Sequence, residues 1–414
     1  MSMNLNYFKE FYLNNEYDEN MFNEDGSINP KYESFKKTGL IATILEDHFT
    51  EAYHLNKQLI DSYRPNAPSE IDKIIKCNNK QLGCRAFECP KCNKILFVSN
   101  TCKSRSCSSC GYKYKEERVN QIVNTAYSCP PRQLVFTIPV ELRKPFFKDF
   151  KNCINILFEA VSETIYSILN ESYKRDPATK KYKCYKNKIK SIPGFFSFLH
   201  TFGRDLKWNP HIHVLLAENK LVNGKFISVQ YLDYDALSKR FMKILLTKLV
   251  KYDRVKFLGI KNDLYKKYKN GLYVYAEKKK FNSFRNGIEY VTRYCGRVPI
   301  SENRILNYDG ENVTFCYNAH EDESYHEVTI TAIEFILMLI RHIAPTQFKI
   351  IRYYGFYRKN YKISDTIKKI VDESQKKFRK WTLKHENLIK AHFDRNPYFC
   401  TACNTRFRLI CAIT

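Results

Sequence analysis

The sequence lacks an apolar run that approaches the ~20 residues of a membrane-spanning helix. The most apolar stretch is 333–343, and its length and composition predict a buried helix. Residues 1–24 are rich in Asn, Tyr and Glu and contain no apolar core of the kind that a signal peptide has. Internal repeats and low-complexity tracts are also absent. These absences predict a protein that has no membrane role and that stays in the cytoplasm.

Acidic residues are scarce relative to basic ones. The 414 residues include 69 Lys and Arg but only 43 Asp and Glu, so the formal net charge is +26. A merely basic cytoplasmic protein is one interpretation, because basicity alone identifies no ligand; a polyanion is the partner that such an excess favours. With 44% apolar residues and 15% aromatics, the chain has enough material for two or three domains with at least one sizeable core.

Seven of the fifteen cysteines fall within 34 residues, between Cys77 and Cys110. Disulfides are uncommon in the reducing cytoplasm, and this segment has few large apolar side chains, so the cysteines are interpreted first as metal ligands. The pairs Cys89-x2-Cys92 and Cys107-x2-Cys110, 14 residues apart, have the spacing of two knuckles that supply four tetrahedral ligands. The sequence therefore predicts one structural Zn²⁺ site formed by these four thiolates.

Three cysteines of the same segment are left over, namely Cys77, Cys84 and Cys102. They can contribute to a second zinc site, for which the fourth ligand is His48, His54 or a cysteine of the tail pair Cys400 and Cys403. Lysines and arginines are interspersed with the cysteines, including Lys103 and Arg105, so the module can present cations to a phosphate backbone. We expect residues 70–125 to be a zinc-binding module that docks on DNA.

Beyond Pro131 the patterns predict a mixed α+β domain. The alternation in 134–140, 195–202, 211–217, 271–276 and 348–357 favours strands, and 195–202 with 211–217 reads as an antiparallel hairpin. Asp309-Gly310 predicts the turn of another hairpin. Apolar residues at helical spacing predict helices around 40–53, 147–169, 234–250, 283–295, 332–342 and 365–384.

A His-Ile-His segment lies in one of the predicted strands. Side chains two apart in a strand share a face, so His211 and His213 project to the same side while Ile212 points into the core. A solvated pair is the common interpretation of an isolated match; the functional one is a divalent metal site that polarises a phosphodiester. His200 and Asp205 are candidates for a third ligand, and His200 depends on the register of the hairpin.

Two tyrosines stand four apart in the predicted helix 283–295. Tyr290 and Tyr294 would lie on one helix face, and a phenolate can attack phosphorus to give a phosphotyrosine ester that preserves the energy of the broken strand. Arg293 and Arg297 can hold nearby phosphates. Because thirty tyrosines produce such spacing by chance, the spacing alone does not establish this role.

The order of these pieces resembles a known family. The cysteine module is followed by Leu199-His-Thr-Phe-Gly-Arg-Asp-Leu-Lys-Trp-Asn-Pro-His-Ile-His-Val214, and then by Tyr290-Val-Thr-Arg-Tyr-Cys-Gly-Arg-Val-Pro-Ile-Ser301. This arrangement, over most of residues 70–357, resembles the rolling-circle insertion-sequence transposases of the His-hydrophobic-His (HUH) two-tyrosine class. Asn209 departs from the family, in which a further histidine is frequent there, and Cys295-Gly296 replaces a usual Thr-His pair.

The resemblance implies a palm-like antiparallel sheet with helices, preceded by a small zinc-binding domain. It implies that His211 and His213 bind a catalytic Mg²⁺ or Mn²⁺, that Tyr290 and Tyr294 attack DNA, and that the cysteines of 77–110 bind zinc. The partner would be DNA, in the form of single-stranded element ends, and the cytoplasmic protein would associate with a prokaryotic nucleoid during action.

The expected organisation has four parts. A helical segment spans 1–69, the zinc-binding domain 70–125, the HUH-type catalytic domain 126–357, and a basic helical tail with a third CxxC pair 358–414. A rolling-circle replication initiator or a plasmid relaxase would use the same chemistry, although the zinc module favours the transposase. A non-catalytic zinc-dependent DNA-binding protein from a decayed element is the alternative from another class.

Overall fold

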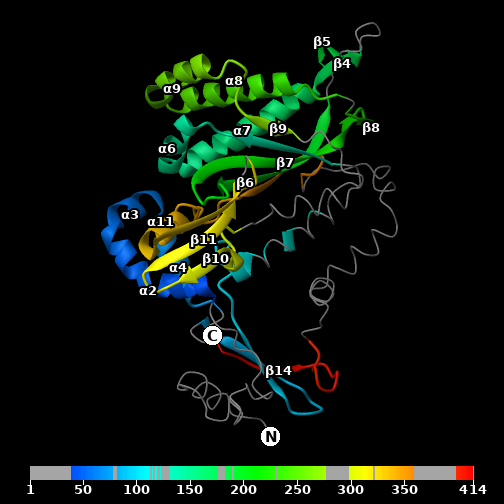
Figure 1. Cartoon of the computed structure of the whole chain (residues 1–414). Coiled ribbons are helices and arrows are strands. Elements are labelled where there is room, and N and C mark those ends of the chain that lie inside the picture. The colour runs from blue at the N-terminus through cyan, green and yellow to red at the C-terminus, as the bar shows by residue number, and fades with distance from the viewer. Residues whose placement is uncertain are drawn as a thin grey trace.

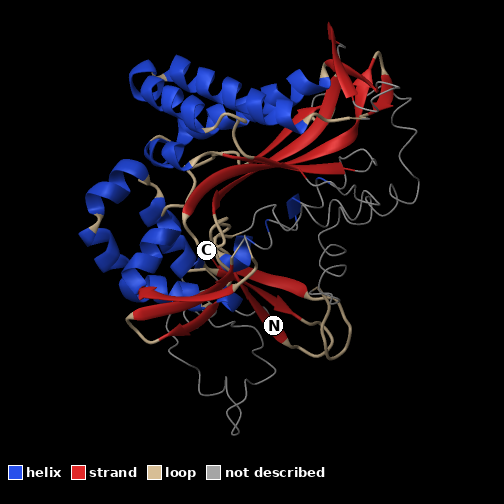
Figure 2. Ribbon diagram, turned by 45° about the horizontal axis from the view of Figure 1, so that its top comes forward, coloured by secondary structure: helices blue, strands red, loops and turns tan. Residues whose placement is uncertain are grey.

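The structure is a computed structural model, and it describes residues 39–77, 82–111, 114, 117–118, 122, 131–175, 182–188, 191–229, 231–276, 298–319, 322–358 and 398–413. Within these ranges no helix is both long enough and apolar enough to cross a membrane. The described chain combines antiparallel sheets with helices, as Figures 1 and 2 show, so the predicted α+β class is confirmed.

A six-stranded antiparallel sheet forms the centre of the molecule (Figure 1). Its order is β13-β6-β7-β3-β9, and β8 pairs with the far end of β7. The two long central strands, β6 and β7, form the antiparallel hairpin that the sequence predicts. The strands are β3 (Pro131–Thr137), β6 (Ile192–Phe202), β7 (Trp208–Val222), β8 (Lys225–Ser228), β9 (Val274–Ala276) and β13 (Ile351–Gly355).

Helices cover one face of this sheet, visible above it in Figure 1. Ile212, Val214 and Leu216 alternate along β7 toward that face and are buried in one core with residues of the helices. Because side chains alternate along a strand, the odd-numbered residues of β7 point away from that core, to the opposite face of the sheet. The helices are α6 (Val140–Lys148), α7 (Phe150–Leu169), α8 (Tyr234–Tyr252) and α9 (Arg254–Lys267).

A second core joins residues 41–77 to residues 300–343. Helices α2 (Leu40–Leu55), α3 (Lys57–Tyr63) and α4 (Ala67–Ile75) lie beside α11 (Ala332–Ile340), as Figures 1 and 2 show. The sheet β10 (Ile305–Tyr308), β11 (Asn312–Asn318) and β12 (Tyr325–Thr331) follows a 3₁₀ turn, η4 (Glu302–Arg304), and packs on the same core. Asp309-Gly310 makes the predicted turn between β10 and β11, and Thr331 begins α11 with a capping box.

Arg64 connects the two cores. Its guanidinium donates hydrogen bonds to the backbone carbonyls of Tyr63, Phe147 and Arg341, which come from three separate elements. It also lies 4.5 Å from the centre of the Phe147 ring. Only 1% of this residue is exposed, and burial lowers its pKa to about 10, so it remains charged at neutral pH. A buried cation that donates to three carbonyls ties helices α2 to α4 to the core of the central sheet.

The cysteine-rich segment contains a small sheet of its own, in the lower part of Figure 1. Strands β1 (Cys84–Glu88) and β2 (Ile95–Ser99) form a hairpin, and the last strand of the chain, β14 (Arg408–Ile413), pairs antiparallel with the other edge of β1. The tail predicted for 358–414 therefore ends inside the module of the predicted zinc-binding domain. The domain boundaries otherwise stay predictions.

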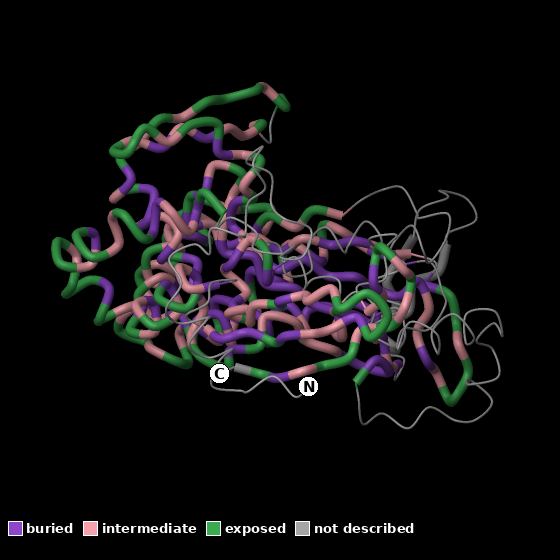
Figure 3. The backbone as a smooth tube through the Cα atoms, turned by 90° about the horizontal axis from the view of Figure 1, so that it is seen from below, coloured by how far each residue is buried: buried purple, intermediate pink, exposed green. Residues whose placement is uncertain are grey.

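The remaining sequence expectations fall into two groups. The helices near 40–53, 147–169, 234–250 and 332–342 are confirmed, whereas the expected helices 283–295 and 365–384 lie outside the described residues. Helix α9, strand β12 and the hairpin of β4 (Glu171–Arg175) with β5 (Tyr182–Lys188) were not expected. Figure 3 shows the buried stretches gathered where the strands and helices pack against one another, with exposed stretches at their connections.

Candidate metal centres and functional site

Three histidines gather on the face of the central sheet opposite α7 and α8. The ring centroids of His200 and His213 are 4.6 Å apart, those of His211 and His213 4.9 Å, and those of His200 and His211 5.4 Å. One ring nitrogen from each residue lies within 4.8 Å of the others. His200 and His213 are buried and His211 is partly buried. The structure thus brings His200 together with the predicted pair.

Strand register explains this convergence. His211 and His213 are two apart on β7, and His200 lies directly opposite His211 on β6. A bulge between His200 and Phe202 falls on the side nearer the hairpin loop, so it leaves that pairing in register. Asp205, the other third-ligand candidate, instead receives the backbone N–H of Lys207 and pairs with the Lys207 ammonium at 3.2 Å. It is absent from the histidine cluster as described.

The protonation of His211 follows from its hydrogen bond. Its Nδ1 lies 2.7 Å from the backbone carbonyl oxygen of Asn209, and a carbonyl only accepts, so Nδ1 carries the proton. In the neutral ring, Nε2 then offers its lone pair. A backbone carbonyl that receives the other ring N–H is the common support of a metal-binding histidine, because it fixes both tautomer and orientation.

His213 has a side-chain partner on β3. Its Nδ1 lies 3.2 Å from the amide nitrogen of Gln133, and the Gln133 oxygen is a buried atom without a hydrogen-bond partner among the described residues. A glutamine amide can be turned over to match its network. With Oε1 toward the ring, Gln133 accepts from Nδ1–H and leaves the Nε2 of His213 for a ligand.

The donor set fits a divalent cation. Three neutral imidazoles can each offer one nitrogen from a single face, and two of the rings have a partner that can hold the other nitrogen. The described cluster contains no carboxylate, so further positions around a cation would be open to water or phosphate oxygens. Such an open site is typical of catalysis rather than of structural support.

Tyr290 and Tyr294 lie outside the described residues, as do Arg293 and Arg297. The described residues on either side of that segment nevertheless lie close to the histidines. On one side, β9 pairs with β3 so that Tyr275 is opposite Val135, which is itself opposite His213. On the other side, Pro299 lines a cavity of about 220 Å³ together with Thr201 and Phe202, which follow His200 on β6.

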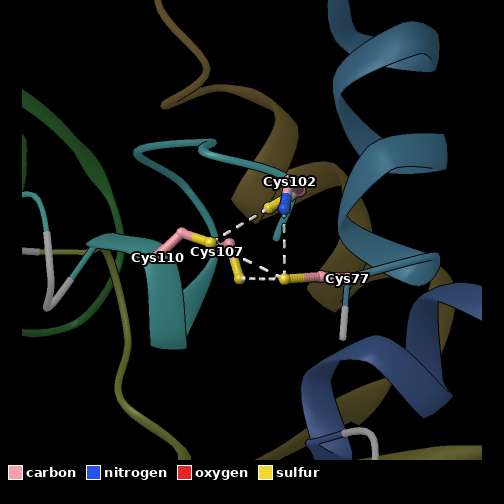
Figure 4. Close-up of side chains that lie close together, drawn as sticks. All are labelled: Cys77, Cys102, Cys107 and Cys110. Atoms are coloured by element: carbon pink, nitrogen blue, oxygen red, sulfur yellow. Dashed lines mark hydrogen bonds between the residues drawn. The ribbon is translucent and has the colours of Figure 1, made fainter. Parts of the chain in front are cut away.

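The first cysteine cluster consists of Cys77, Cys102, Cys107 and Cys110, drawn in Figure 4. Cys77 follows the end of α4, and its sulfur lies 3.6 Å from that of Cys110 and 3.7 Å from that of Cys107. The sulfur of Cys102 lies 3.5 Å from that of Cys110. Tetrahedral Zn–S bonds of about 2.3 Å place sulfurs roughly 3.8 Å apart, so this spacing fits zinc.

The chemistry of this cluster favours the ionised form of at least one thiol. Hydrogen bonds from Cys102, Cys107 and Cys77 hold the pKa of Cys110 well below its usual range. The same interactions raise the pKa of Cys102, because the proton that it donates becomes harder to remove. The thiolate is the form that binds metal, so the cluster is arranged for a cation that can replace the shared protons.

The prediction that Cys89, Cys92, Cys107 and Cys110 share one site is wrong. Cys107 and Cys110 belong to the first cluster, whereas Cys89 and Cys92 meet the tail cysteines in a second one, Cys89, Cys92, Cys400 and Cys403. The physical reason is that β1 and β2 carry the first knuckle away from the Cys77 cluster, and β14 brings the tail beside it. Among the further ligands expected from the sequence, which were His48, His54 and the two tail cysteines, only the tail cysteines lie in a described cluster, and they join Cys89 and Cys92.

The other candidates lie elsewhere. Cys84 is buried in β1 and belongs to neither of the described clusters. His48 contacts the carbonyl oxygen of Gly310 at 2.7 Å, and the ring of His54 lies against Tyr53. Sequence reasoning missed the connection of the tail with the first knuckle, although both segments have the pattern Cys-x-x-Cys-Asn.

Two of the four basic residues expected to contact DNA, Lys103 and Arg105, lie within the described residues beside the first cluster. Lys103 is exposed, and both Lys103 and Arg105 line the 220 Å³ cavity with His342 and Pro299. One N–H of Arg105 donates to the carbonyl oxygen of Phe348 at 2.9 Å, so this guanidinium also connects the module to the segment before β13. The cavity therefore lies where the cysteine module meets the central sheet.

Comparison with known proteins agrees with this division. Residues 44–138 match the family model described as "Transposase zinc-binding domain", and residues 194–364 match the one described as "Putative transposase". The first range contains the seven clustered cysteines, and the second contains the three histidines and both tyrosines.

Two curated relatives cover most of the chain. The "Transposase for insertion sequence element IS801" of Pseudomonas savastanoi pv. phaseolicola is 24% identical over 367 residues, which is 83% of each chain. The "Putative transposase y4qJ" of Sinorhizobium fredii is 25% identical over 337 residues, or 76% of this chain and 79% of its own length.

A cysteine module joined to an antiparallel sheet with a histidine cluster defines a DNA transposase with its own zinc-binding module. The chain carries the two parts that these family models describe, and the resemblance to insertion-sequence transposases stated from the sequence is confirmed. The module binds structural zinc, and the protein acts on DNA.

Proposed function

We propose that this transposase cleaves and rejoins single DNA strands through Tyr290 and Tyr294, beside a divalent cation bound by His200, His211 and His213. The observation that carries the proposal is the convergence of three imidazole nitrogens within 4.8 Å on the face of the central sheet opposite α7 and α8. Mg²⁺ or Mn²⁺ is the proposed cation. It would polarise the scissile phosphodiester and neutralise charge that grows in the transition state.

The residues around the cluster preorganise it. The Asn209 carbonyl keeps the proton of His211 on Nδ1, and Gln133 holds His213 from the neighbouring strand. Because β6 and β7 pair on both sides of the histidines, the sheet fixes the backbone positions from which the three rings project. Ligands that rest on paired strands hold a cation more accurately than ligands on a loop.

The covalent step balances without a nucleotide cofactor. The phenolate oxygen of one tyrosine attacks the phosphorus, the bond from phosphorus to the 3′ oxygen breaks, and this oxygen leaves as a 3′-hydroxyl after it takes a proton. The product is a 5′-phosphotyrosine ester. Attack by a 3′-hydroxyl on that ester rejoins a strand and releases the tyrosine. A second tyrosine allows another cleavage before the first ester is resolved.

The positions of β9 and Pro299 support the placement of the tyrosines near the histidines. Strand β9, two strands from β7 in the sheet, ends at Ala276, and Pro299 lines a cavity with Thr201 and Phe202. The two tyrosines lie between Ala276 and Pro299 in the sequence. We propose that Arg293 and Arg297 hold phosphates in the same region, and that Lys103 and Arg105 hold DNA at the cysteine module.

The substrate proposed is single-stranded DNA from the ends of the element, and action on DNA in a prokaryotic cell places the protein in the cytoplasm, at the nucleoid. The net charge of +26 supports a polyanionic partner, and its binding should weaken steeply with salt. Covalent attachment to DNA distinguishes the active transposase from a non-catalytic DNA-binding protein of a decayed element. Both would carry the positive charge, but only the enzyme would form a bond to DNA.

The test uses purified full-length protein and single-stranded oligonucleotides from the element ends, with Mn²⁺ or Mg²⁺. We expect an adduct that survives SDS, that needs the cation, and that His211→Ala with His213→Ala abolishes. The exposed His326 provides the matched control, because His326→Ala should leave the adduct unchanged. Binding without any adduct on correct ends would contradict the proposal and favour the non-catalytic interpretation.

A further inference from the structure

The two ends of the second cysteine cluster are built alike. In Cys89-Pro-Lys-Cys92-Asn93-Lys94, the backbone N–H of Cys89 donates to the Lys94 carbonyl at 2.9 Å, and the N–H of Asn93 donates to the Cys89 carbonyl at 2.9 Å. Asn93 has a φ of 55°, the left-handed conformation that asparagine adopts more readily than most residues. This loop is a tight knuckle that brings the sulfurs of Cys89 and Cys92 to the same cluster.

The tail repeats every one of these features. In Cys400-Thr-Ala-Cys403-Asn404-Thr405, the N–H of Cys400 donates to the Thr405 carbonyl at 2.8 Å, and the N–H of Asn404 donates to the Cys400 carbonyl at 2.8 Å. Asn404 has a φ of 51°. The two knuckles are more than 300 residues apart in the sequence, yet each follows the same hydrogen-bond pattern with the same residue in the strained position.

The knuckles face each other sulfur to sulfur. The sulfur of Cys89 lies 3.2 Å from that of Cys403, and the sulfur of Cys92 lies 3.6 Å from both Cys400 and Cys403. All four sulfurs lie within 4.8 Å of one another. These separations approach the edge of about 3.8 Å in a Zn–S tetrahedron and exceed the S–S bond of about 2.05 Å.

Apolar packing gives no adequate account of this cluster. Cys89 and Cys400 are buried, but Cys92 is exposed and Cys403 is partly exposed, and the small core of the module contains Cys84 and Cys411 but none of the four. Buried cysteines that serve as small apolar side chains lie inside cores. Here four thiols gather at the edge of a sheet, where only an ion or oxidation would hold them together.

We infer that Cys89, Cys92, Cys400 and Cys403 form a second structural zinc site, which fastens the C-terminal end of the chain to the zinc-binding module. The site completes a three-stranded sheet, because β14 follows the tail knuckle directly and pairs with β1 along its whole length. The Arg408 guanidinium also pairs with Glu88 at 2.8 Å across the same two strands.

This arrangement has a consequence for assembly. The match to the transposase zinc-binding domain ends at residue 138. Two of the four proposed zinc ligands of this site, Cys400 and Cys403, nevertheless come from far beyond it. The module therefore reaches its full structure only after residues 400–413 have been synthesised. Closing a loop of this length by a metal removes much conformational freedom from the unfolded chain, so the bound zinc should stabilise the folded module.

The decisive experiment counts zinc in the full-length chain. His211→Ala with His213→Ala serves as the parent, so that only cysteine-bound zinc is measured by mass spectrometry of the metal. We expect two zinc ions per chain in the parent and one after Cys400→Ser with Cys403→Ser. Cys316→Ser, which lies in β11 outside both clusters, is the matched control and should keep two.

A second measurement covers the case in which the double serine variant fails to fold. Co²⁺ replaces zinc in the folded parent, and its thiolate charge-transfer absorption counts the four-cysteine sites directly. Two such sites per chain support the inference, and one site overturns it. Disulfides between Cys89 and Cys403 or between Cys92 and Cys400 in protein purified under reducing conditions would overturn it as well. Amide exchange of β14 should accelerate in the double serine variant while β6 keeps its protection.

Discussion

His200 and His211 stand directly opposite each other across the hairpin of β6 and β7, with ring centroids 5.4 Å apart. This single cross-strand pair converts the His-Ile-His motif into a three-nitrogen site. The site depends on register, because a shift of one residue would turn His200 into the core between the sheet and helices α7 and α8. The β-bulge beyond His200 absorbs the irregularity of the hairpin loop and so protects the pairing.

We predict that His200 is a full member of the metal site. His200→Ala should weaken Mn²⁺ binding at least 10-fold, as should His211→Ala, because each removes one of three nitrogens. Isothermal titration of zinc-loaded protein with Mn²⁺ measures this, with His326→Ala as the control. Unchanged affinity in His200→Ala would leave His211 and His213 as the site and His200 as a buried neighbour.

Gln133 should act on the metal through His213. Gln133→Leu removes the partner of Nδ1, and the loss of such a partner typically weakens metal affinity about 10–100-fold. Gln133→Glu should restore affinity, because a carboxylate accepts from Nδ1–H at least as well as an amide does. If Leu and Glu weaken Mn²⁺ binding equally, Gln133 only fills space.

Stability should fall in mild acid because of His342. Burial lowers its pKa from 6.5 to about 4, while Nε2 lies 2.9 Å from the Leu206 carbonyl and Nδ1 lies 3.1 Å from the Thr201 hydroxyl. Between these two pKa values the unfolded chain binds a proton that the folded chain does not. The contribution is therefore complete above pH 6.5 and decreases as the pH falls toward 4.

From pH 7.5 to 5 this loss amounts to about 2 kcal/mol. Glutamine does not titrate, so between pH 7.5 and 5 the free energy of unfolding of His342→Gln should fall by about 2 kcal/mol less than that of the wild type. Urea unfolding at the two pH values measures this difference. Comparing the two proteins cancels the acid sensitivity of the zinc sites, which both retain. Parallel stability curves for the two proteins would show that His342 is protonated in the folded state or is not buried.

Substitution of the buried Arg64, which lies between the two cores, should strongly reduce the free energy of unfolding. Arg64→Met leaves three carbonyls without their donor and should cost about 3–5 kcal/mol of unfolding free energy. Arg254→Met, at an exposed arginine that begins α9, should change it by less than about 0.5 kcal/mol. A small loss in Arg64→Met would mean that apolar contacts hold the leading helices alone.

The sequence predicts local structure well where periodicity is strong. The hairpin of β6 and β7, helix α7 and the turn at Asp309-Gly310 all follow from patterns of apolar residues and turn residues. His211 and His213 share a face because strand geometry requires it. His200 could be named only as a candidate, because its orientation depends on the register of two strands, which a pattern does not fix.

Which cysteines share a cluster also depends on tertiary structure, and sequence patterns do not fix it. Nearness along the chain favoured Cys89, Cys92, Cys107 and Cys110 as one site, but ligands are chosen by position in space. Strand β14 brings Cys400 and Cys403 to the first knuckle, and α4 brings Cys77 to the second CxxC pair. The shared Cys-x-x-Cys-Asn pattern was the one local signal that connected the distant knuckles.

The central claim is that Tyr290 and Tyr294 are the nucleophiles beside the histidine site. The most direct measurement traps the protein on a single-stranded element end with Mn²⁺, digests it, and identifies the nucleotide-bearing peptide by mass spectrometry. The account predicts a 5′-phosphotyrosine on Tyr290 or Tyr294, and no adduct in the variant with Tyr290→Phe and Tyr294→Phe. An undiminished adduct in that variant, on any other residue, would contradict it.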